Sequence, residues 1–295
     1  MMLSRRQALA AGGLAALFPM VSSAAAERLV VAGGALTEIA VALGHARYLA
    51  GVDETSLYPP AVVAPLPKIG YLRTLSAEGI LSLAPSLLLA SDQAGPPAVL
   101  AQLRGAGVNV VTVPEIHAAE AVEGKIRTVA AALGDEAGGG RMAASVRADL
   151  AAVDRMVADR KQTPRVLFIM STSNGRVMAA GRDTAADLML TRAGGRNVMA
   201  GYAGYKPATP EAILAADPDV VLLPQHSLMA LGGMTGVASL PALAGTAAVR
   251  HKHIHALDML YMLGLGPRIA HAVRDMAVML HPGMALPALP PRSWT

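Results

Sequence analysis

Between residues 137 and 160 the chain reads AGGGRMAASVRADLAAVDRMVADR. The larger apolar residues of this segment recur at spacings of three and four, the period of one helix face: Met142, Val146, Leu150, Val153 and Val157. Alanine, arginine and leucine favour helix, whereas a flexible linker would be rich in glycine and serine throughout. We therefore predict one long, stiff amphipathic helix within residues 135–163, ended by Pro164.

Short apolar runs alternate with helix-like sequence on both sides of this segment. They are Leu29–Val31, Leu87–Ala90, Val108–Val113, Val166–Met170, Val220–Leu223 and His253–Leu257. Buried strands that alternate with helices are typical of a mainly parallel sheet with helices on both faces. The sequence thus predicts an α/β protein with two lobes, residues 27–134 and 164–295, joined by the long helix.

Composition narrows the class of protein further. Of the 295 residues, 53% are hydrophobic and 16% are charged, which suits two packed domains and excludes a disordered chain. The formal charge of +4 is spread along the sequence without a basic run, which argues against nucleic-acid binding. Because neither a Gly-x-Ser-x-Gly elbow nor a Gly-x-Gly-x-x-Gly turn is present, we do not expect an enzyme.

The N-terminal residues have the order of a cleavable export signal. Ser4-Arg5-Arg6 precedes the apolar stretch Ala8–Phe18, and the small residues Ala24-Ala25-Ala26 suit a peptidase. We predict a signal peptide at residues 1–26, resembling a twin-arginine signal; a permanent anchor helix is the alternative. Its removal would take away two arginines and no acid, so the charge would fall from +4 to +2. This sequence has no cysteine, and hence no disulfide, thiolate metal site or lipid-carrying cysteine.

Two similar segments lie 133 residues apart. Leu75–Leu81 reads LSAEGIL, and Ala208–Leu214 reads ATPEAIL. In each segment a hydroxyl residue suits the N-cap of a helix, and a glutamate, Glu78 or Glu211, follows in the first turn, where the helix dipole favours an anion. Helix capping explains either glutamate alone. A matched pair in two lobes could also serve as surface carboxylates for a partner with two-fold symmetry.

A tyrosine and an arginine stand close together in the loop before the first of these segments. Tyr71 and Arg73 follow a proline-rich stretch, at the carboxyl end of a strand, where α/β folds bind ligands. A tyrosine phenol ionises only near pH 10, but Fe(III) and a nearby cation both favour the phenolate, and tyrosinate is an axial ligand of ferric haem. Arg73 could supply that cation from the same side of an extended loop. A packed loop aromatic is the alternative for Tyr71.

Three segments together carry a family resemblance. Asp53–Ser56, Lys68–Leu83 and Leu263–Arg268 resemble the haem-binding periplasmic proteins of bacterial haemin ABC transporters, a class with a rigid helix between its lobes. The resemblance implies a periplasmic protein that carries ferric haem b in the cleft, with Tyr71 as axial ligand and Arg73 supporting it. Siderophore and cobalamin binders share the fold and are the alternative.

The same resemblance implies partners. In this class a glutamate on each lobe meets arginines of the inner-membrane permease dimer, which works with its ATPase; these glutamates correspond to Glu78 and Glu211. An outer-membrane haem receptor would act upstream.

The second lobe offers weaker candidates for the cleft. Some members of the family carry a histidine there, but residues 197–206 contain none. Tyr202 and Tyr205 could instead line the cleft. Lys206 could pair with a haem propionate or be an ordinary surface lysine, and His226, which follows the strand at Val220–Leu223, could make a distal contact.

The remaining histidines receive structural interpretations. His251, His253 and His255 alternate, so in a strand they would share one face, but no carboxylates converge with them to complete a metal site. His117, His271 and His281 have no local partner that marks a site. We expect them at ordinary helix or surface positions.

Overall fold

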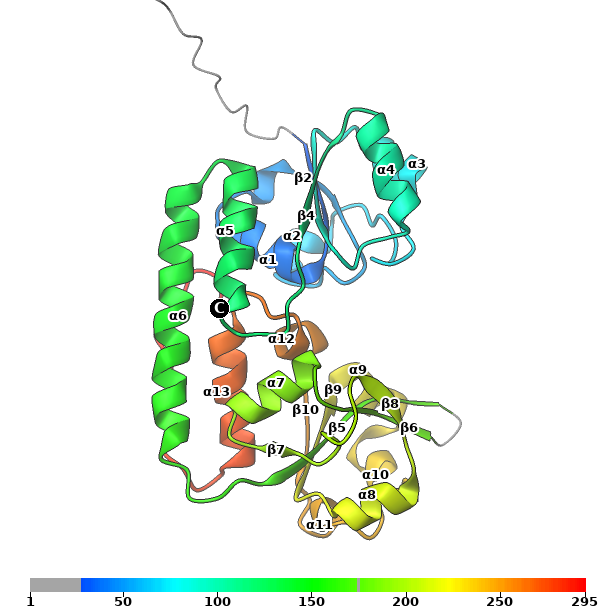
Figure 1. Ribbon diagram of the computed structural model, residues 1–295, viewed down its shortest axis with the longest axis vertical. Helices are drawn as coiled ribbons and strands as arrows, with labels where there is room; N and C mark the ends of the chain where they lie inside the picture. The colour runs from blue at the N-terminus through cyan, green and yellow to red at the C-terminus, as the bar shows by residue number, and fades with distance from the viewer. Residues whose placement is uncertain (1–27, 174–175) are drawn as a thin grey trace, which may run out of the picture.

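In the computed structural model, which describes residues 28–173 and 176–295, two α/β lobes are stacked along the long axis of the molecule (Figure 1). The predicted signal peptide at residues 1–26 lies outside the described residues. No helix within the described ranges combines the length and apolarity needed to cross a bilayer.

The first lobe contains a four-stranded sheet in which all strands are parallel. The strands are β1 (Leu29–Ala32), β2 (Leu49–Val52), β3 (Leu87–Ser91) and β4 (Asn109–Val113), in the order β2-β1-β3-β4. Because all four run the same way, their carboxyl ends meet at one edge of the sheet, which faces the second lobe (Figure 1).

Helices cover both faces of this sheet. On one face lie α1 (Gly34–Ala42) and α5 (Ala121–Leu133), and on the other lie α3 (Ala77–Leu81) and α4 (Pro97–Gly105). The short helices η1 (Ala46–Tyr48) and α2 (Pro60–Val63) belong to the connections around β2. The right-handed crossover rule for parallel strands accounts for helices on both faces.

The second lobe contains a mixed sheet. Its strands are β5 (Arg165–Ser173), β6 (Arg176–Ala180), β7 (Arg196–Asn197), β8 (Tyr205–Ala208), β9 (Val220–Pro224) and β10 (Ile254–Leu257). The order is β10-β9-β5-β6-β8, with β7 also pairing β5. The pairs among β10, β9, β5 and β7 are parallel, and those of β6 with β5 and β8 are antiparallel.

The helices of the second lobe again flank the sheet. They are α7 (Ala185–Arg192), α8 (Pro210–Ala216), α9 (Gln225–Ala230), α10 (Gly233–Ala238), α11 (Ala247–Arg250), α12 (Met259–Leu263) and α13 (Ile269–Leu280). Side chains of α8, α10 and α11 pack on one face, and those of α7 and α13 pack on the other. The predicted fold class, two mainly parallel sheets flanked by helices, is confirmed.

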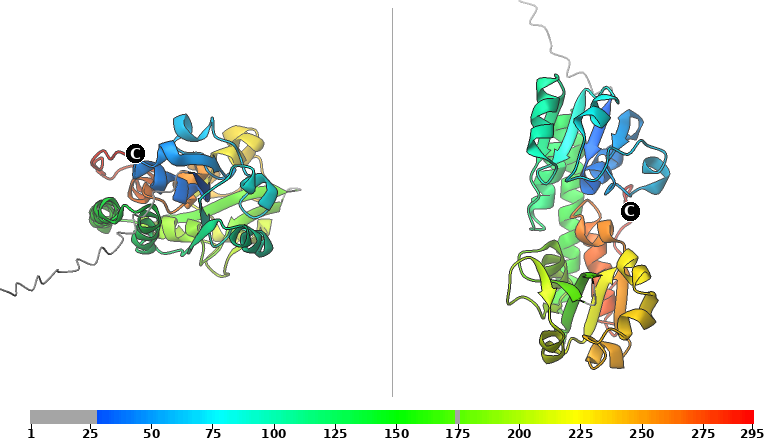
Figure 2. Two further views of the ribbon diagram at one scale, coloured as in Figure 1. Left: turned by 90° about the horizontal axis from the view of Figure 1, so that it is seen from above. Right: turned by 90° about the vertical axis from the view of Figure 1, so that its right-hand side faces the viewer.

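One helix, α6 (Glu136–Ala158), runs beside both lobes (Figures 1 and 2). Its 23 residues span about 35 Å at 1.5 Å per residue. Asp135 caps it by accepting the Gly138 backbone N–H at 2.9 Å. All five of its predicted apolar residues are buried, in one hydrophobic cluster that continues into both lobes and includes α13. The lobes therefore share a core along this rod.

Polar contacts also join the lobes. Arg268, before α13, forms an ion pair with the buried Glu38 of α1 at 2.6 Å, and its guanidinium lies 3.6 Å from the centre of the Tyr58 ring. The Lys125 ammonium of α5 reaches the Leu265 carbonyl of the second lobe at 3.3 Å. These contacts lie where α12 and the following turn meet the first lobe.

The three alternating histidines His251, His253 and His255 are not arranged as predicted. His251 is the C-cap of α11 and His253 precedes β10, which begins only at Ile254, so only His255 lies in the strand. The rings of His253 and His255 are stacked, with centres 6.5 Å apart. The prediction of three histidines on one strand face was therefore wrong.

Candidate ligand-binding site

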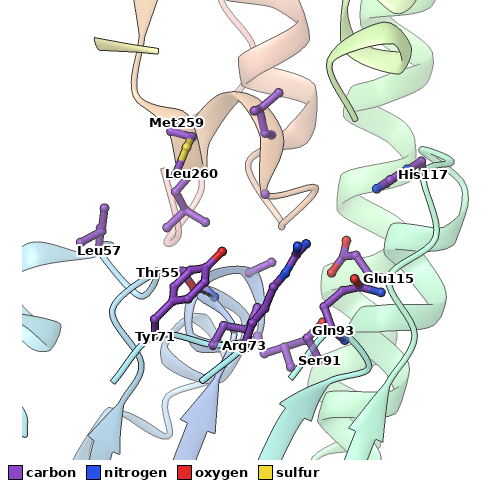
Figure 3. A pocket seen from close by; sticks show the side chains of 17 residues that line it. Thr55, Leu57, Tyr71, Arg73, Ser91, Gln93, Glu115, His117, Met259 and Leu260 are labelled. Carbon is purple, nitrogen blue, oxygen red and sulfur yellow. Dashed lines mark hydrogen bonds between the residues drawn. The ribbon is translucent and has the colours of Figure 1, made fainter. Parts of the chain in front are cut away.

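A pocket lies where the carboxyl ends of the first lobe's strands face α12 of the second lobe (Figure 3). The lining residues come from the ends of all four strands of that sheet and from α12. They include Gly34, Thr55, Leu57, Tyr71, Arg73, Gln93, Glu115, His117, Met259 and Leu260. The position agrees with the rule that open α/β sheets bind ligands at strand carboxyl ends.

Tyr71 is held at this pocket by a turn. Gly70 has a φ of +92°, a conformation that a residue with a side chain adopts only under strain, and its carbonyl accepts the Glu54 N–H at 3.0 Å. The Tyr71 carbonyl accepts the Thr74 N–H at 2.8 Å. The segment is thus a turn and not the extended loop that we predicted. The Tyr71 side chain is 45% exposed and available to a ligand.

Arg73 lies beside Tyr71. Figure 3 shows both side chains rising from the turn into the same pocket, as the sequence predicted for the pair. The nearby carboxylate of Glu115 is bound instead by Lys125, at 2.7 Å. Arg73 therefore places a positive charge in the pocket, next to the phenol.

Asp53 does not line the pocket but holds the backbone segments that do. Its side chain is fully buried and accepts hydrogen bonds from the Gly33 N–H at 2.9 Å, the Thr55 hydroxyl at 2.6 Å and the Ser56 hydroxyl at 2.7 Å. The Thr55 hydroxyl in turn accepts the Gly34 N–H at 3.1 Å. This network fixes the start of α1 against the loop after β2, so the pocket floor is already formed in the structure.

Apolar side chains form the rest of the wall. Leu57 of the first lobe is 50% exposed, and Met259 and Leu260 approach from α12 (Figure 3). A Cβ atom on Gly34 would lie 2.6 Å from both the Thr55 carbonyl oxygen and the Leu260 side chain, so glycine is required for the loop after β2 and α12 to come this close. The wall offers apolar contacts suited to an aromatic ligand.

His117 is exposed, as expected for a surface position, but it also lines the pocket, which we did not predict. It follows β4 in the loop before α5, and its ring Nδ1 lies 3.2 Å from the Asp183 carbonyl oxygen of the second lobe. Asp183 is 66 residues away along the chain, so no local sequence pattern could reveal this contact. Glu115 and Gln93 were missed as well, although each closely follows a predicted strand.

The candidates in the second lobe lie elsewhere. Tyr202 donates its hydroxyl to the Ala179 carbonyl at 3.2 Å, and Lys206 lies 5.7 Å from the Tyr202 ring centre. Burial raises the pKa of both Tyr202 and Tyr205, which makes these phenols harder to ionise than in water. His226 is exposed on α9, with Nε2 3.3 Å from the Ser227 hydroxyl. None of the four is among the residues that line the pocket.

Glu78 and Glu211 occupy matching places in the two lobes. Ser76 accepts the Gly79 N–H at 3.4 Å and Thr209 accepts the Ala212 N–H at 3.2 Å, so both N-caps form as predicted. Each glutamate is exposed in the first turn of its helix. Figure 1 places α3 and α8 on the side of the molecule away from α6.

Histidine and carboxylate groups do not converge into a metal site within the described ranges.

The chain is similar in sequence and fold to solved haem-binding proteins. The periplasmic heme-binding protein RhuT from Roseiflexus sp. RS-1, in its apo form, shares 43% sequence identity and a TM-score of 0.84, covering 87% of this chain and 98% of that one. The periplasmic heme-binding protein BhuT in complex with two hemes shares 44% identity and a TM-score of 0.83, covering 88% of this chain and 99% of that one.

A more distant relative has another named ligand. The vitamin B12-binding protein of Vibrio cholerae is 26% identical over 256 residues, which are 86% of this chain and 89% of that protein. The sequence model of the periplasmic binding protein family matches residues 29–260. With that match, the two-lobed fold and the pocket between the lobes, the chain belongs to the periplasmic binding protein family.

Proposed function

We propose that this protein is a periplasmic carrier that binds ferric haem b in the pocket at Tyr71 and delivers it to an inner-membrane ABC importer. The observation that carries the proposal is an exposed phenol beside a guanidinium, in a pocket with apolar walls. The similarity to haem-binding proteins at 43–44% identity supports the same ligand.

The pocket chemistry suits haem. A phenolate oxygen is a hard, anionic ligand that favours ferric iron, and the Arg73 guanidinium next to it favours the anionic form. Leu57, Met259 and Leu260 offer apolar surface to the porphyrin faces. The protein binds and releases this cargo without covalent chemistry.

The second-lobe residues Tyr202, Tyr205, Lys206 and His226 stay predictions for contacts with the ligand in the cleft. The exposed Lys206 ammonium is suited to a haem propionate, and His226 to a distal contact.

Export and docking complete the proposal. Residues 1–26 would direct export, by a twin-arginine signal, and would be removed. Glu78 and Glu211 would meet arginines of the permease dimer and its ATPase assembly, with an outer-membrane haem receptor upstream. The exposure of both carboxylates at matching helix starts supports this docking.

A cobalamin or siderophore carrier is the second candidate. The vitamin B12-binding relative favours it. The two ligands differ in what they require, because cobalamin brings its own axial base, whereas haem iron in this pocket needs the phenol.

Titration of the apo-protein with ferric haem tests the proposal, with cobalamin as a parallel ligand. We expect a tyrosinate–iron absorption band for the wild type and its loss in Tyr71→Phe. Tyr48→Phe is the matched control, because Tyr48 also pairs with an arginine, Arg47 at 2.7 Å, but lies outside the pocket. An unchanged spectrum in Tyr71→Phe, or binding of cobalamin alone, would contradict the proposed cargo.

A further inference from the structure

The geometry points to His117 as the second axial ligand of the haem that Tyr71 binds. This inference rests on the proposed function and deepens it. His117 lies in the loop that joins β4 to α5, at the same sheet edge as Tyr71, and lines the same pocket. In Figure 3 its ring extends from the loop into the pocket, on the side opposite Leu57.

The hydrogen bond of the ring determines which nitrogen is free for a metal. A backbone carbonyl can only accept, so the Nδ1 atom, 3.2 Å from the Asp183 oxygen, must carry the proton. In the neutral ring Nε2 then bears a lone pair, and in the described chain it has no hydrogen-bond partner. Metal-binding histidines have this arrangement, with the second nitrogen donating to a carbonyl that fixes the tautomer and the ring orientation.

The Asp183 carbonyl is itself held in place. Asp183 has a φ of +63° and stands directly before Thr184, the N-cap of α7, whose side chain is buried and accepts the Asp187 N–H at 3.1 Å. A second contact nearby, the ion pair between Glu120 of the first lobe and Arg192 of α7, holds the β4–α5 loop that carries His117. The orientation of His117 is thus set by the opposite lobe.

The other polar groups of the pocket are poorer ligands for ferric iron. Glu115 is occupied by the Lys125 ion pair at 2.7 Å. Met259 offers a soft thioether, which favours reduced metals, whereas imidazole suits iron in either state. The Gln93 amide carries no charge and is a weak donor. Among these side chains, His117 is the one with a free nitrogen lone pair.

Spectra of the haem complex test the assignment. The variants are His117→Ala, which removes the ring, and His117→Asn, which removes the metal ligand and keeps an N–H that can donate to Asp183. His45→Ala is the control, because His45 packs on Tyr48 outside the pocket. Each apo-protein is loaded with one equivalent of ferric haem, and the spin state is read by electron paramagnetic resonance and absorption.

We expect a six-coordinate, low-spin signal in the wild type and in His45→Ala. Both His117 variants should give the high-spin signal of an iron bound by tyrosinate alone, and added imidazole should restore the low-spin signal to His117→Ala. A low-spin His117→Asn would assign the ring a structural role only and overturn the inference.

The two proposals fail in different ways. If the wild type binds haem through Tyr71 but is high-spin and unaffected by the His117 substitutions, the ligand assignment is wrong and the haem carrier stands. If the wild type binds no haem, or if Tyr71→Phe leaves binding unchanged, the carrier proposal itself is wrong and the ligand assignment falls with it.

Discussion

Asp53 shows how one side chain can organise a pocket that it does not line. Its carboxylate holds the N–H of Gly33 and the hydroxyls of Thr55 and Ser56, in an environment closed to water. A buried donor that loses its acceptor destabilises the folded protein, because it has given up its hydrogen bonds to water without gaining another partner. The residue therefore matters for stability and for the shape of the pocket floor together.

Replacing Asp53 by alanine should lower the free energy of unfolding by about 3 kcal/mol, because several buried donors lose their acceptor at once. Urea unfolding measures this change. Asp92→Ala, at an exposed position after β3, should change stability by less than about 0.5 kcal/mol. Equal losses of unfolding free energy in the two variants would show that the hydrogen bonds of Asp53 do not stabilise the protein.

At this scale the sequence allows part of the site to be predicted. Tyr71 and Arg73 could be identified because their chemistry and their place after a strand are both local features. Asp53 belongs to a segment that carried the family resemblance, but its partner Gly33 is 20 residues away. His117 could not be identified, because its defining contact comes from the other lobe.

The pair of helices α5 and α6 depends on a glycine at their contact. A Cβ atom on Gly139 would lie 2.2 Å from the Ala130 Cβ, whereas one on the adjacent Gly140 would meet only the Arg127 side chain, at 3.9 Å. Alanine favours helix over glycine at both positions by about 1 kcal/mol. Steric fit therefore decides which substitution the helix accepts.

Gly140→Ala should raise the free energy of unfolding by about 0.5–1 kcal/mol. Gly139→Ala should lower it by about 1–3 kcal/mol, because the extra methyl group forces α5 and α6 apart. Thermal unfolding of the two single variants gives the comparison. A stabilised Gly139→Ala protein would mean that the helices can separate at little cost.

An ion pair at the start of β5 should make the stability of the protein depend on pH. Arg165 binds Asp219 at 2.8 Å and lowers the pKa of that carboxyl. Because the pKa is lower in the folded protein, the stabilisation is complete above the ordinary aspartate pKa of about 3.9 and is lost as the pH falls further. The pair is partly exposed, so its contribution stays below about 1 kcal/mol.

Asp219→Asn should therefore be slightly less stable than the wild type at neutral pH, and the difference should narrow in acid. Urea unfolding at pH 7 and pH 3 measures it. In an Arg165→Ala background the same substitution should make little difference at either pH. A difference as large at pH 3 as at pH 7 would assign the effect to something other than the ion pair.

The strands differ in how well the sequence predicts them. All six predicted runs correspond to strands, because buried parallel strands are continuously apolar. The edge strand β8 (Tyr205–Ala208) was missed, since Lys206 and Pro207 are exposed and break the apolar pattern. β2 was missed because Gly51 interrupts its apolar run.

The two lobes share one continuous hydrophobic core and are joined by polar contacts. Besides Glu38–Arg268, an ion pair ties the C-terminal residues to the long helix: Arg292 binds Asp149 of α6 at 2.6 Å. Within the second lobe, the Trp294 indole N–H donates to the Pro267 carbonyl at 3.1 Å. The long helix was predictable from its period, whereas these ties join residues too distant in the sequence to be paired by inspection.

The Glu38–Arg268 pair should contribute strongly to stability. Removing either partner leaves a buried charge, so Glu38→Ala and Arg268→Ala should each cost about 3–5 kcal/mol. The double variant should cost clearly less than the sum, with a coupling of about 1–3 kcal/mol. The exposed pair Glu123–Arg147 is the control and should show less than about 1 kcal/mol. Additive costs at Glu38 and Arg268 would refute a direct interaction between the lobes here.

The long helix α6, which both lobes share, and the ion pair between the lobes restrict changes in the distance between α3 and α8. If Glu78 and Glu211 dock on the permease as proposed, their fixed spacing would fit it whether the carrier is loaded or empty. The two carboxylates would then position the carrier without signalling its load, and a transporter that distinguishes a full carrier from an empty one would have to contact the pocket itself.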